Sequence, residues 1–325
     1  MRLRPVFPVI GILVVILMGC SSATSTEQPN ASTNATQPST SSIPFAASTD
    51  QRNLQPSPSD HHQSTPITTP FPSEDDWDEL PVIPTVSDTA RQIYQRGLEL
   101  GNNPQAFSII GDCNSTSPFF LSSFDNGSYA LGEYSHLQAT IDQFAGSFQR
   151  VGFGVMVGAS ASTILSPLCS NPQMCFPSES PIECEFNRHK PSVSIIQLGT
   201  NGWDDMAIFE TRMRRIIEIS IEHGVVPMLA TKADNREGDH GINRTLAYLA
   251  LEYDLPLWNF WLALQPLPNH GMTDDGIHLS WGNSYFDDPE NMKSGWAIRN
   301  LTALQALDAM WHGLSQNQDS ETTHH

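Results

Sequence analysis

The chain carries little basic charge. Its 325 residues include 16 Lys and Arg against 35 Asp and Glu, which gives a formal net charge of −19. Sequence-independent binding to nucleic acid depends on clustered Lys and Arg that neutralise phosphates. The composition therefore excludes a general role in nucleic-acid binding, and we expect no nucleic acid partner.

The chain also lacks an apolar run long enough to cross a bilayer as a stable helix. The apolar segment at residues 6–18 is too short and follows Arg2 and Arg4, as in an export signal. It ends in Leu17-Met18-Gly19-Cys20, which resembles the lipobox of bacterial lipoproteins. The resemblance implies removal of a signal peptide (residues 1–19) and diacylglycerol on the Cys20 thiol. The alternative is an ordinary signal peptide with an incidental cysteine. We predict an extracytoplasmic lipoprotein anchored in the bacterial cell envelope.

Cysteine is scarce too. Besides Cys20 there are Cys113, Cys169, Cys175 and Cys184, and the last three lie in a Pro- and Ser-rich loop at residues 166–191. Their spacing is not the paired short spacing of structural zinc sites, so no metal is expected. Outside the cytoplasm disulfides are the ordinary outcome. Two bridges would consume Cys113, whereas one bridge would leave it and one other cysteine free.

Composition divides the chain into three parts after the signal. Residues 20–80 are rich in Ser, Thr, Pro, Asn and Gln and have few apolar side chains, so they predict a disordered linker. An acidic run at residues 74–79 closes the linker and is interpreted as a solvated segment. A globular domain follows at residues 81–316, and residues 317–325 form a disordered tail.

Strands and helices are expected to alternate through the domain. Ser87 is a predicted N-cap for the first helix. Such alternation predicts an α/β domain with a mainly parallel sheet covered on both faces. Strands are expected at residues 107–110, 150–157, 193–198, 225–230 and 256–260, and helices at residues 133–144, 205–223, 242–253 and 292–314.

Three short motifs carry chemically useful side chains. Gly111-Asp112-Cys113 and Gly199-Thr200-Asn201 each follow an expected strand, and Asp275-Gly276-Ile277-His278 lies near the C-terminus. Because parallel strands end at a common edge, the first two motifs are expected to meet there.

These side chains are the types that acyl transfer needs: a nucleophile, a base, an orienting carboxylate and donors for an oxyanion. His278 is the expected base, and Asp275, three residues earlier, is expected to hold its imidazole in one tautomer. Asp274 has the less suitable spacing. Asn201 is expected to direct its amide at the oxyanion.

In order and spacing these motifs resemble those of the SGNH (GDSL-like) hydrolase family. The resemblance implies a flavodoxin-like three-layer α/β/α fold and hydrolysis of acyl esters, often of carbohydrates or lipids, with no cofactor. It also implies that the backbone N–H groups of Cys113 and Gly158 complete an oxyanion hole with Asn201. Gly152 and Gly154 compete with Gly158, because the glycine motif of the family is poorly matched here.

The departure from the family lies at the nucleophile, where Cys113 replaces the usual serine. Cys113 is a competent nucleophile if it pairs with His278. Alternatively, a disulfide to the 166–191 loop would leave a catalytically inactive binding module, or Ser115 would act instead. We predict a monomeric, surface-tethered esterase, with the inactive binding module as the alternative.

Several other polar and aromatic residues are expected to have structural and not catalytic roles. Lys232, His240 and His270 are expected at surface or loop positions. Trp203, Trp258 and Trp261 are expected to pack in or around the core.

Overall fold

The computed structural model describes residues 74–116, 118–203 and 205–315. The predicted signal peptide, Cys20, the linker up to residue 73 and the tail from residue 317 lie outside the described residues. Within the described part of the chain, no helix combines the length and the apolar character needed to span a bilayer.

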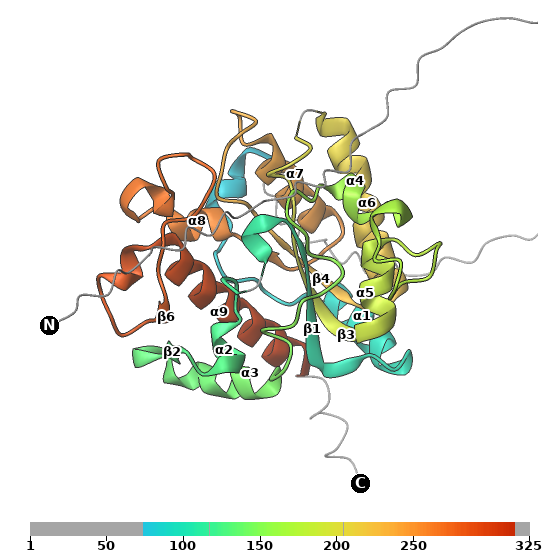
Figure 1. The fold of residues 1–325 in the computed structure, drawn as a ribbon, viewed down its shortest axis with the longest axis horizontal. Helices are drawn as coiled ribbons and strands as arrows, with labels where there is room; N and C mark the ends of the chain where they lie inside the picture. Colours follow the sequence, from blue (N-terminus) through green and yellow to red (C-terminus); the bar gives the residue numbers. More distant parts are fainter. Residues whose placement is uncertain (1–73, 117, 204, 316–325) are drawn as a thin grey trace, which may run out of the picture. The chain divides into compact units, whose positions relative to one another are not determined.

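A parallel sheet forms the centre of the domain (Figure 1). Its strands are hydrogen-bonded in the order β1 (Asn103–Gly111), β3 (Pro191–Gln197), β4 (Val226–Ala230) and β5 (Leu257–Trp258), and every pair is parallel. All residues of β3 and β4 are buried, as expected for strands covered on both faces. The predicted parallel sheet is confirmed.

Helices cover the two faces of this sheet. On one face α5 (Pro181–His189), α6 (Met206–Glu222) and α7 (Gly241–Glu252) pack in succession. On the other face lies α9 (Gly295–Ser315), with α1 (Asp88–Glu99) against it. This is the predicted three-layer α/β/α arrangement.

Short elements complete the domain. The α-helices are α2 (Ser123–Asn126), α3 (Gln138–Gln143), α4 (Ala161–Ile164) and α8 (Phe260–Leu264), and β2 (Tyr129–Ala130) pairs in parallel with β6 (Ser284–Tyr285). The 3-10 turns are η1 (Glu74–Glu79), η2 (Cys113–Ser115), η3 (Gly132–Leu137), η4 (Pro167–Cys169), η5 (Pro268–Gly271) and η6 (Asn291–Lys293).

The strand predicted at residues 150–157 does not form. Only an isolated parallel bridge joins Val155 to Gly111, where the Gly111 N–H donates to the Gly154 carbonyl at 3.0 Å. Gly154 crosses so close to β1 that a Cβ atom would overlap the Ile110 side chain. Glycine weakens a strand, and here it serves close approach instead. The segment nevertheless occupies the outer place beside β1, so the order matches that of flavodoxin-like sheets.

Helix α5 lies inside the segment predicted to be a loop. Its start carries a recognisable signature, because the Ser180 and Glu183 side chains form a capping box and Pro181 occupies the first turn. The high proline and cysteine content of the surrounding segment concealed that signature.

The folded domain begins before residue 81, where the predicted linker ends. Trp77 is only 7% exposed, and its ring centroid lies 4.7 Å from that of Trp261. The Asn259 amide donates to the carbonyls of Trp77 at 3.1 Å and Leu80 at 2.8 Å. A buried indole contributes a large apolar area, which outweighs the acidic residues beside it.

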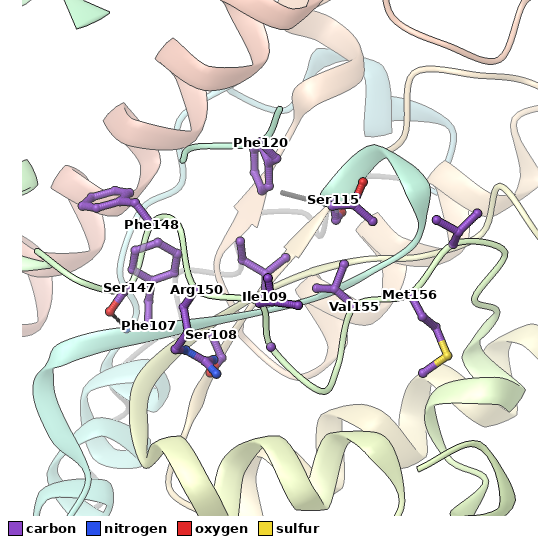
Figure 2. A pocket seen from close by; sticks show the side chains of 14 residues that line it. Phe107, Ser108, Ile109, Ser115, Phe120, Ser147, Phe148, Arg150, Val155 and Met156 are labelled. Atoms are coloured by element: carbon purple, nitrogen blue, oxygen red, sulfur yellow. Dashed lines mark hydrogen bonds between the residues drawn. The ribbon is translucent and has the colours of Figure 1, made fainter. Parts of the chain in front are cut away.

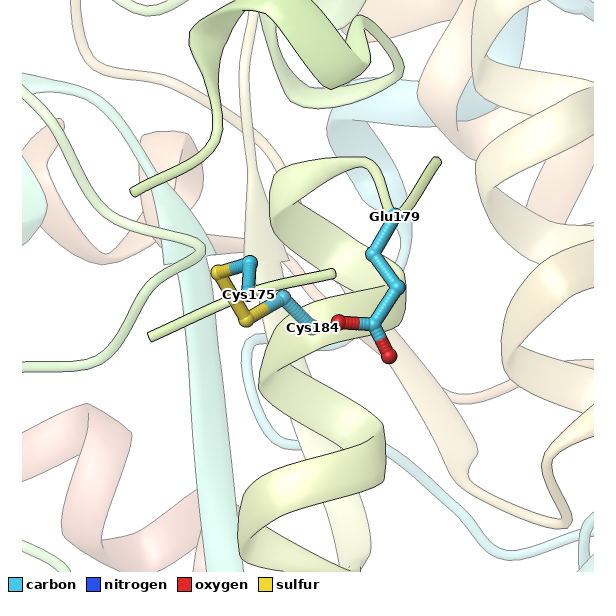
Figure 3. Close-up of side chains that lie close together, drawn as sticks. All are labelled: Cys175, Glu179 and Cys184. Carbon is cyan, nitrogen blue, oxygen red and sulfur yellow. A yellow bond between two sulfur atoms is a disulfide. The ribbon is translucent and has the colours of Figure 1, made fainter. Parts of the chain in front are cut away.

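One disulfide, Cys175–Cys184, joins the loop after η4 to α5 (Figure 3). Glu179 lies beside the two sulfur atoms, but its carboxylate accepts from the Phe176 N–H at 2.7 Å and from Arg188 at 3.0 Å. The two sulfur atoms are bonded to each other, so we interpret the two cysteines as a disulfide that holds this loop against α5.

A buried polar cluster lies between β1 and α5. The fully buried Glu185 carboxylate accepts from the Ser108 hydroxyl at 2.5 Å and forms an ion pair with Arg150. Beside it the half-buried His189 ring contacts the Phe107 carbonyl through Nε2, at 3.1 Å. Burial, reinforced by the positive charge of Arg150, lowers the pKa of His189 from its ordinary 6.5 to about 4.

The low pKa of His189 predicts a loss of stability in mild acid. As the pH falls from about 6.5 toward 4, the unfolded chain binds a proton that the folded chain does not. We expect this group to lower the free energy of unfolding by up to about 3 kcal/mol over that range, and less where solvent screens the ring. Urea unfolding of wild type and His189→Gln at several pH values measures the difference.

The glutamine variant keeps a hydrogen-bond donor and removes the titration, so its stability is expected to change less with pH. His136→Gln, which removes an exposed histidine, is the control and is expected to behave as wild type. Equal acid sensitivity in all three proteins would contradict the prediction.

Candidate active site

The turn after β1 places Cys113 at the carboxyl edge of the sheet. Gly111 lies so close to Ser115 that a Cβ atom would overlap the serine side chain, so glycine is required here. The Asp112 carboxylate accepts the Asn114 N–H at 3.0 Å and caps η2. Cys113 is half-buried and is a free thiol. The disulfide therefore does not consume it.

Burial controls the charge of this turn. Burial, followed by the neighbouring Asp112 carboxylate, raises the pKa of the Cys113 thiol. Asp112 is 2% exposed, and burial raises its own pKa as well. In the structure without substrate, the thiol is therefore the favoured form at neutral pH.

Arg299 of α9 supplies a buried cation next to the turn. It is 1% exposed, and its guanidinium carbon lies 4.2 Å from the Phe120 ring centroid and 5.0 Å from that of Phe260. Its Nη2 atom donates to the Ser115 hydroxyl at 3.3 Å. Burial lowers the pKa of Arg299 to about 9, while the Asp112 carboxylate opposes that shift.

The contact with Arg299 also bears on the predicted alternative that Ser115 is the nucleophile. That serine is 3% exposed and its hydroxyl accepts from the guanidinium, so its position suits support of the turn better than nucleophilic attack. The sequence interpretation did not identify Arg299. The available signal was that Arg299 is the one Lys or Arg in α9.

The second motif follows β3 in a tight turn. Gly199 has a φ of 121°, and a Cβ atom there would overlap the Ile242 side chain of α7. The Thr200 hydroxyl donates to Asp234 at 2.7 Å, and Asp234 forms an ion pair with Lys232 at 2.8 Å. Lys232 lies in the loop that follows β4, as one of the two expected positions has it, but it is buried at 2% exposure. This buried network holds the turn in place.

Asn201 lies next to the glycine loop that the family resemblance identified. Its amide nitrogen donates to the Ala159 carbonyl at 3.3 Å, which joins this turn to the loop at Gly158. Gly158 has a φ of 77° and open space around it. Gly152 packs on Glu185 and Gly154 on β1. Of the three glycines, Gly158 is the one beside the Ala159 carbonyl that Asn201 contacts.

Asp275 and His278 form a pair within one loop. The His278 Nδ1 atom lies 2.6 Å from the Asp275 carboxylate, which also accepts the backbone N–H groups of Ile277 at 2.8 Å and His278 at 2.9 Å. These hydrogen bonds, first that of the imidazole, hold the pKa of Asp275 well below its usual range. An ionised carboxylate at Nδ1 favours the tautomer whose Nε2 atom is a free base.

Cys113 and His278, the predicted nucleophile and base, do not contact each other in the structure. Among the described residues no hydrogen bond joins the Cys113 thiol to the His278 ring, and the His278 side chain is 58% exposed. Such contacts often form only in the complex with substrate. The structure therefore joins Asp275 to His278 and Asn201 to the loop at Gly158, and leaves the His278 ring open to solvent.

A cavity of about 260 Å³ opens beside the nucleophile turn (Figure 2). Its wall includes the rings of Phe107, Phe120 and Phe148 from β1 and the loops beside it, and Ser115 lines it from the turn. The lining is predominantly apolar, with Arg150 as its charged member. A cavity of this kind suits the hydrocarbon part of a small ligand.

Comparison with known proteins finds matches among solved structures alone. No protein-family model and no curated protein matches the chain. Solved structures that resemble it include the psychrotrophic esterase EstA from Pseudoalteromonas sp., at 13% identity over 66% of this chain and 99% of that chain, with a TM-score of 0.40. A GDSL-like lipase from Bacteroides thetaiotaomicron is similar at 14% identity over 67% and 97%, with a TM-score of 0.39. At such identities the likeness concerns the fold alone.

The raised pKa of Cys113 predicts slow alkylation at neutral pH. Only the thiolate reacts with iodoacetamide, so the rate is expected to rise with pH, with a midpoint above that of an ordinary cysteine. Asp112→Asn keeps the acceptor for the Asn114 N–H and removes the negative charge, so its midpoint is expected to fall. Peptide mapping by mass spectrometry follows the Cys113 peptide separately from the other cysteines.

Asp287→Asn removes an exposed acid and is the control, with no expected change. An unchanged or higher midpoint in Asp112→Asn would show that Asp112 does not disfavour the thiolate.

Proposed function

We propose that the chain is a surface-tethered hydrolase of ester bonds that uses Cys113 as nucleophile, His278 as base and Asp275 as orienter. The observation that carries this proposal is the 2.6 Å contact between the His278 Nδ1 atom and the Asp275 carboxylate. An ionised carboxylate at Nδ1 favours the imidazole tautomer that can take a proton at Nε2, which acyl transfer needs.

The proposed reaction begins when His278 Nε2 takes the thiol proton of Cys113. The sulfur attacks the ester carbonyl carbon, and the carbonyl electrons move onto oxygen to give a tetrahedral oxyanion. Collapse of this intermediate breaks the bond to the alkoxy oxygen, which leaves as an alcohol after taking the proton from His278. Water, deprotonated by the same imidazole, then hydrolyses the acyl thioester and releases the carboxylic acid and Cys113.

Acyl transfer also needs donors for the oxyanion and a place for the acyl group, and residues near Cys113 are proposed for both. The backbone N–H groups of Cys113 and Gly158 and the Asn201 amide are the proposed oxyanion donors, because each donor directed at a developing charge lowers the barrier. The Asn201 amide has a second N–H beyond the one that it gives to Ala159. The apolar cavity beside Ser115 is the proposed place for the acyl group.

We further propose that diacylglycerol on Cys20 anchors the protein outside the cytoplasmic membrane. The support is the Leu17-Met18-Gly19-Cys20 segment after the apolar run. A disulfide such as Cys175–Cys184 is also typical of proteins outside the reducing cytosol.

Hydrolysis of p-nitrophenyl acetate tests the catalytic assignment. Cys113→Ala is expected to abolish turnover above background. His278→Ala is expected to lower kcat/KM by about 10²- to 10⁴-fold, the usual range for a general base. His136→Ala, which removes an exposed histidine outside this loop, is expected to keep wild-type activity. One background rate shared by wild type, Cys113→Ala and His278→Ala would refute the hydrolase.

Cys113→Ser distinguishes a chain that lacks only a competent nucleophile from one that also lacks a working base and oxyanion donors. Serine restores the side chain that the family resemblance implies. A gain of esterase activity in this variant over an inactive wild type would show that base and oxyanion donors are in place and that the cysteine silences the chain.

A catalytically inactive binding module is the second candidate. The observations that favour it are the raised pKa of Cys113 and the lack of a hydrogen bond from its thiol to His278 among the described residues. Free Cys113 removes one argument for this candidate, since its disulfide version required Cys113 to be bridged.

A further inference from the structure

A second cavity, of about 170 Å³, lies between the loop that follows the nucleophile turn and the segment that leads into β6. Three aromatic side chains at its rim are unusually open to solvent: Trp281 is 65% exposed, Phe119 46% and Tyr285 42%. Large apolar rings that gather at one place and are this open to solvent point to a binding surface.

No side chain that lines this cavity carries a charge. Its polar groups are serine hydroxyls and the amides of asparagines such as Asn126 and Asn283. The larger cavity beside β1 contains Arg150 instead. In a chain with a net charge of −19, an uncharged lining argues against phosphate, carboxylate and amine ligands, whose strongest hydrogen bonds are made with charged partners.

The lining is held in position before any ligand binds. The Asn300 side chain accepts the Leu121 N–H at 2.9 Å and donates to the Phe119 carbonyl and the Ser284 hydroxyl, both at 3.2 Å. It therefore fastens the loop of Phe119 to β6. The Phe119 ring also meets the Trp281 ring edge to face, with 5.5 Å between centroids.

A second asparagine holds the segment that forms the opposite wall of the cavity, at residues 281–285. The Asn291 side chain accepts the Asn283 N–H at 2.7 Å and donates to the carbonyls of Asn283 and Tyr285, both at 2.8 Å. Trp281 and Tyr285 flank this fastened segment. A preformed wall lowers the entropy cost of binding a ligand.

We propose that this cavity binds a neutral sugar, with a sugar ring stacked on Trp281 and its hydroxyls bonded to the asparagine and serine side chains. A sugar presents a face of C–H groups, which packs on aromatic rings, and hydroxyls that both donate and accept. An acyl chain would cover the exposed Asn126 and Asn283 side chains and take away their hydrogen bonds to water without replacing them.

The position of the cavity links this proposal to the candidate active site. Trp281 lies three residues after His278, and Phe119 lies six residues after Cys113, so the same two loops carry both sets of side chains. Sugar binding nevertheless goes beyond ester hydrolysis, because it requires neither the thiol nor the imidazole.

Isothermal titration of the mature chain with cellohexaose, xylohexaose, mannohexaose and chitohexaose tests the proposal, with the hexamer of galacturonic acid as the charged probe. At least one neutral hexamer is expected to bind, and more tightly than the charged one. Trp281→Ala is expected to weaken that binding by about tenfold or more, as for an exposed aromatic anchor. Trp281→Phe keeps a ring and is expected to recover part of the loss.

Phe176→Ala is the matched control. Its ring is also 65% exposed but lies in the disulfide-bonded loop, so binding is expected to stay at the wild-type level. Thermal unfolding verifies that each variant is folded. Failure of every neutral hexamer to bind, or equal binding by Trp281→Ala and wild type, overturns the proposal, as does tighter binding of the charged hexamer.

Two further variants separate this proposal from the proposed hydrolysis. Cys113→Ala and His278→Ala are expected to bind the same hexamer as tightly as wild type, even though their esterase activity is lost. If the wild type binds a neutral hexamer but hydrolyses no ester, the sugar site is supported and the proposed hydrolase is rejected. Esterase activity without binding of any neutral hexamer would do the reverse.

Discussion

The parallel ladder between β1 and β3 is the constraint on which the candidate site depends. Its register places Gly111 opposite Gln197, so both strands end at the same level of the sheet. The turn with Cys113 and the turn with Asn201 therefore start side by side. Each turn needs a glycine because another side chain packs directly against its backbone: Ser115 against Gly111, and Ile242 against Gly199.

Buried polar groups hold these turns where apolar packing alone would not. Lys232 pairs with both Asp234 and Glu237, at 2.8 Å and 2.7 Å, and Asp234 accepts the Thr200 hydroxyl. Arg299 supports the other turn from within a ring of aromatic side chains. Burying such charges is costly unless they are paired, so networks of this kind define one arrangement more than they add stability.

Two cavities of different character are lined by segments that also carry candidate site residues. The cavity beside β1 is mainly apolar, whereas the cavity at Trp281 is aromatic and uncharged. Together the two proposals predict an acyl ester of a neutral sugar as the ligand. Such a ligand suits a binding module as well as a hydrolase, because the Cys113 thiol takes part in the proposed reaction and not in the proposed sugar binding.

The sequence by itself determined the α/β alternation and the Asp275–His278 pair, because both depend on residues that are near neighbours in the chain. Only the tertiary structure decided the places of Arg299 and Trp77 and the open rim at Trp281. Each of those depends on contacts between segments far apart in the sequence: Arg299 reaches Ser115, and Trp77 packs on Trp261. Local patterns specify elements and turns, whereas the surroundings of a side chain are set by which elements the fold brings together.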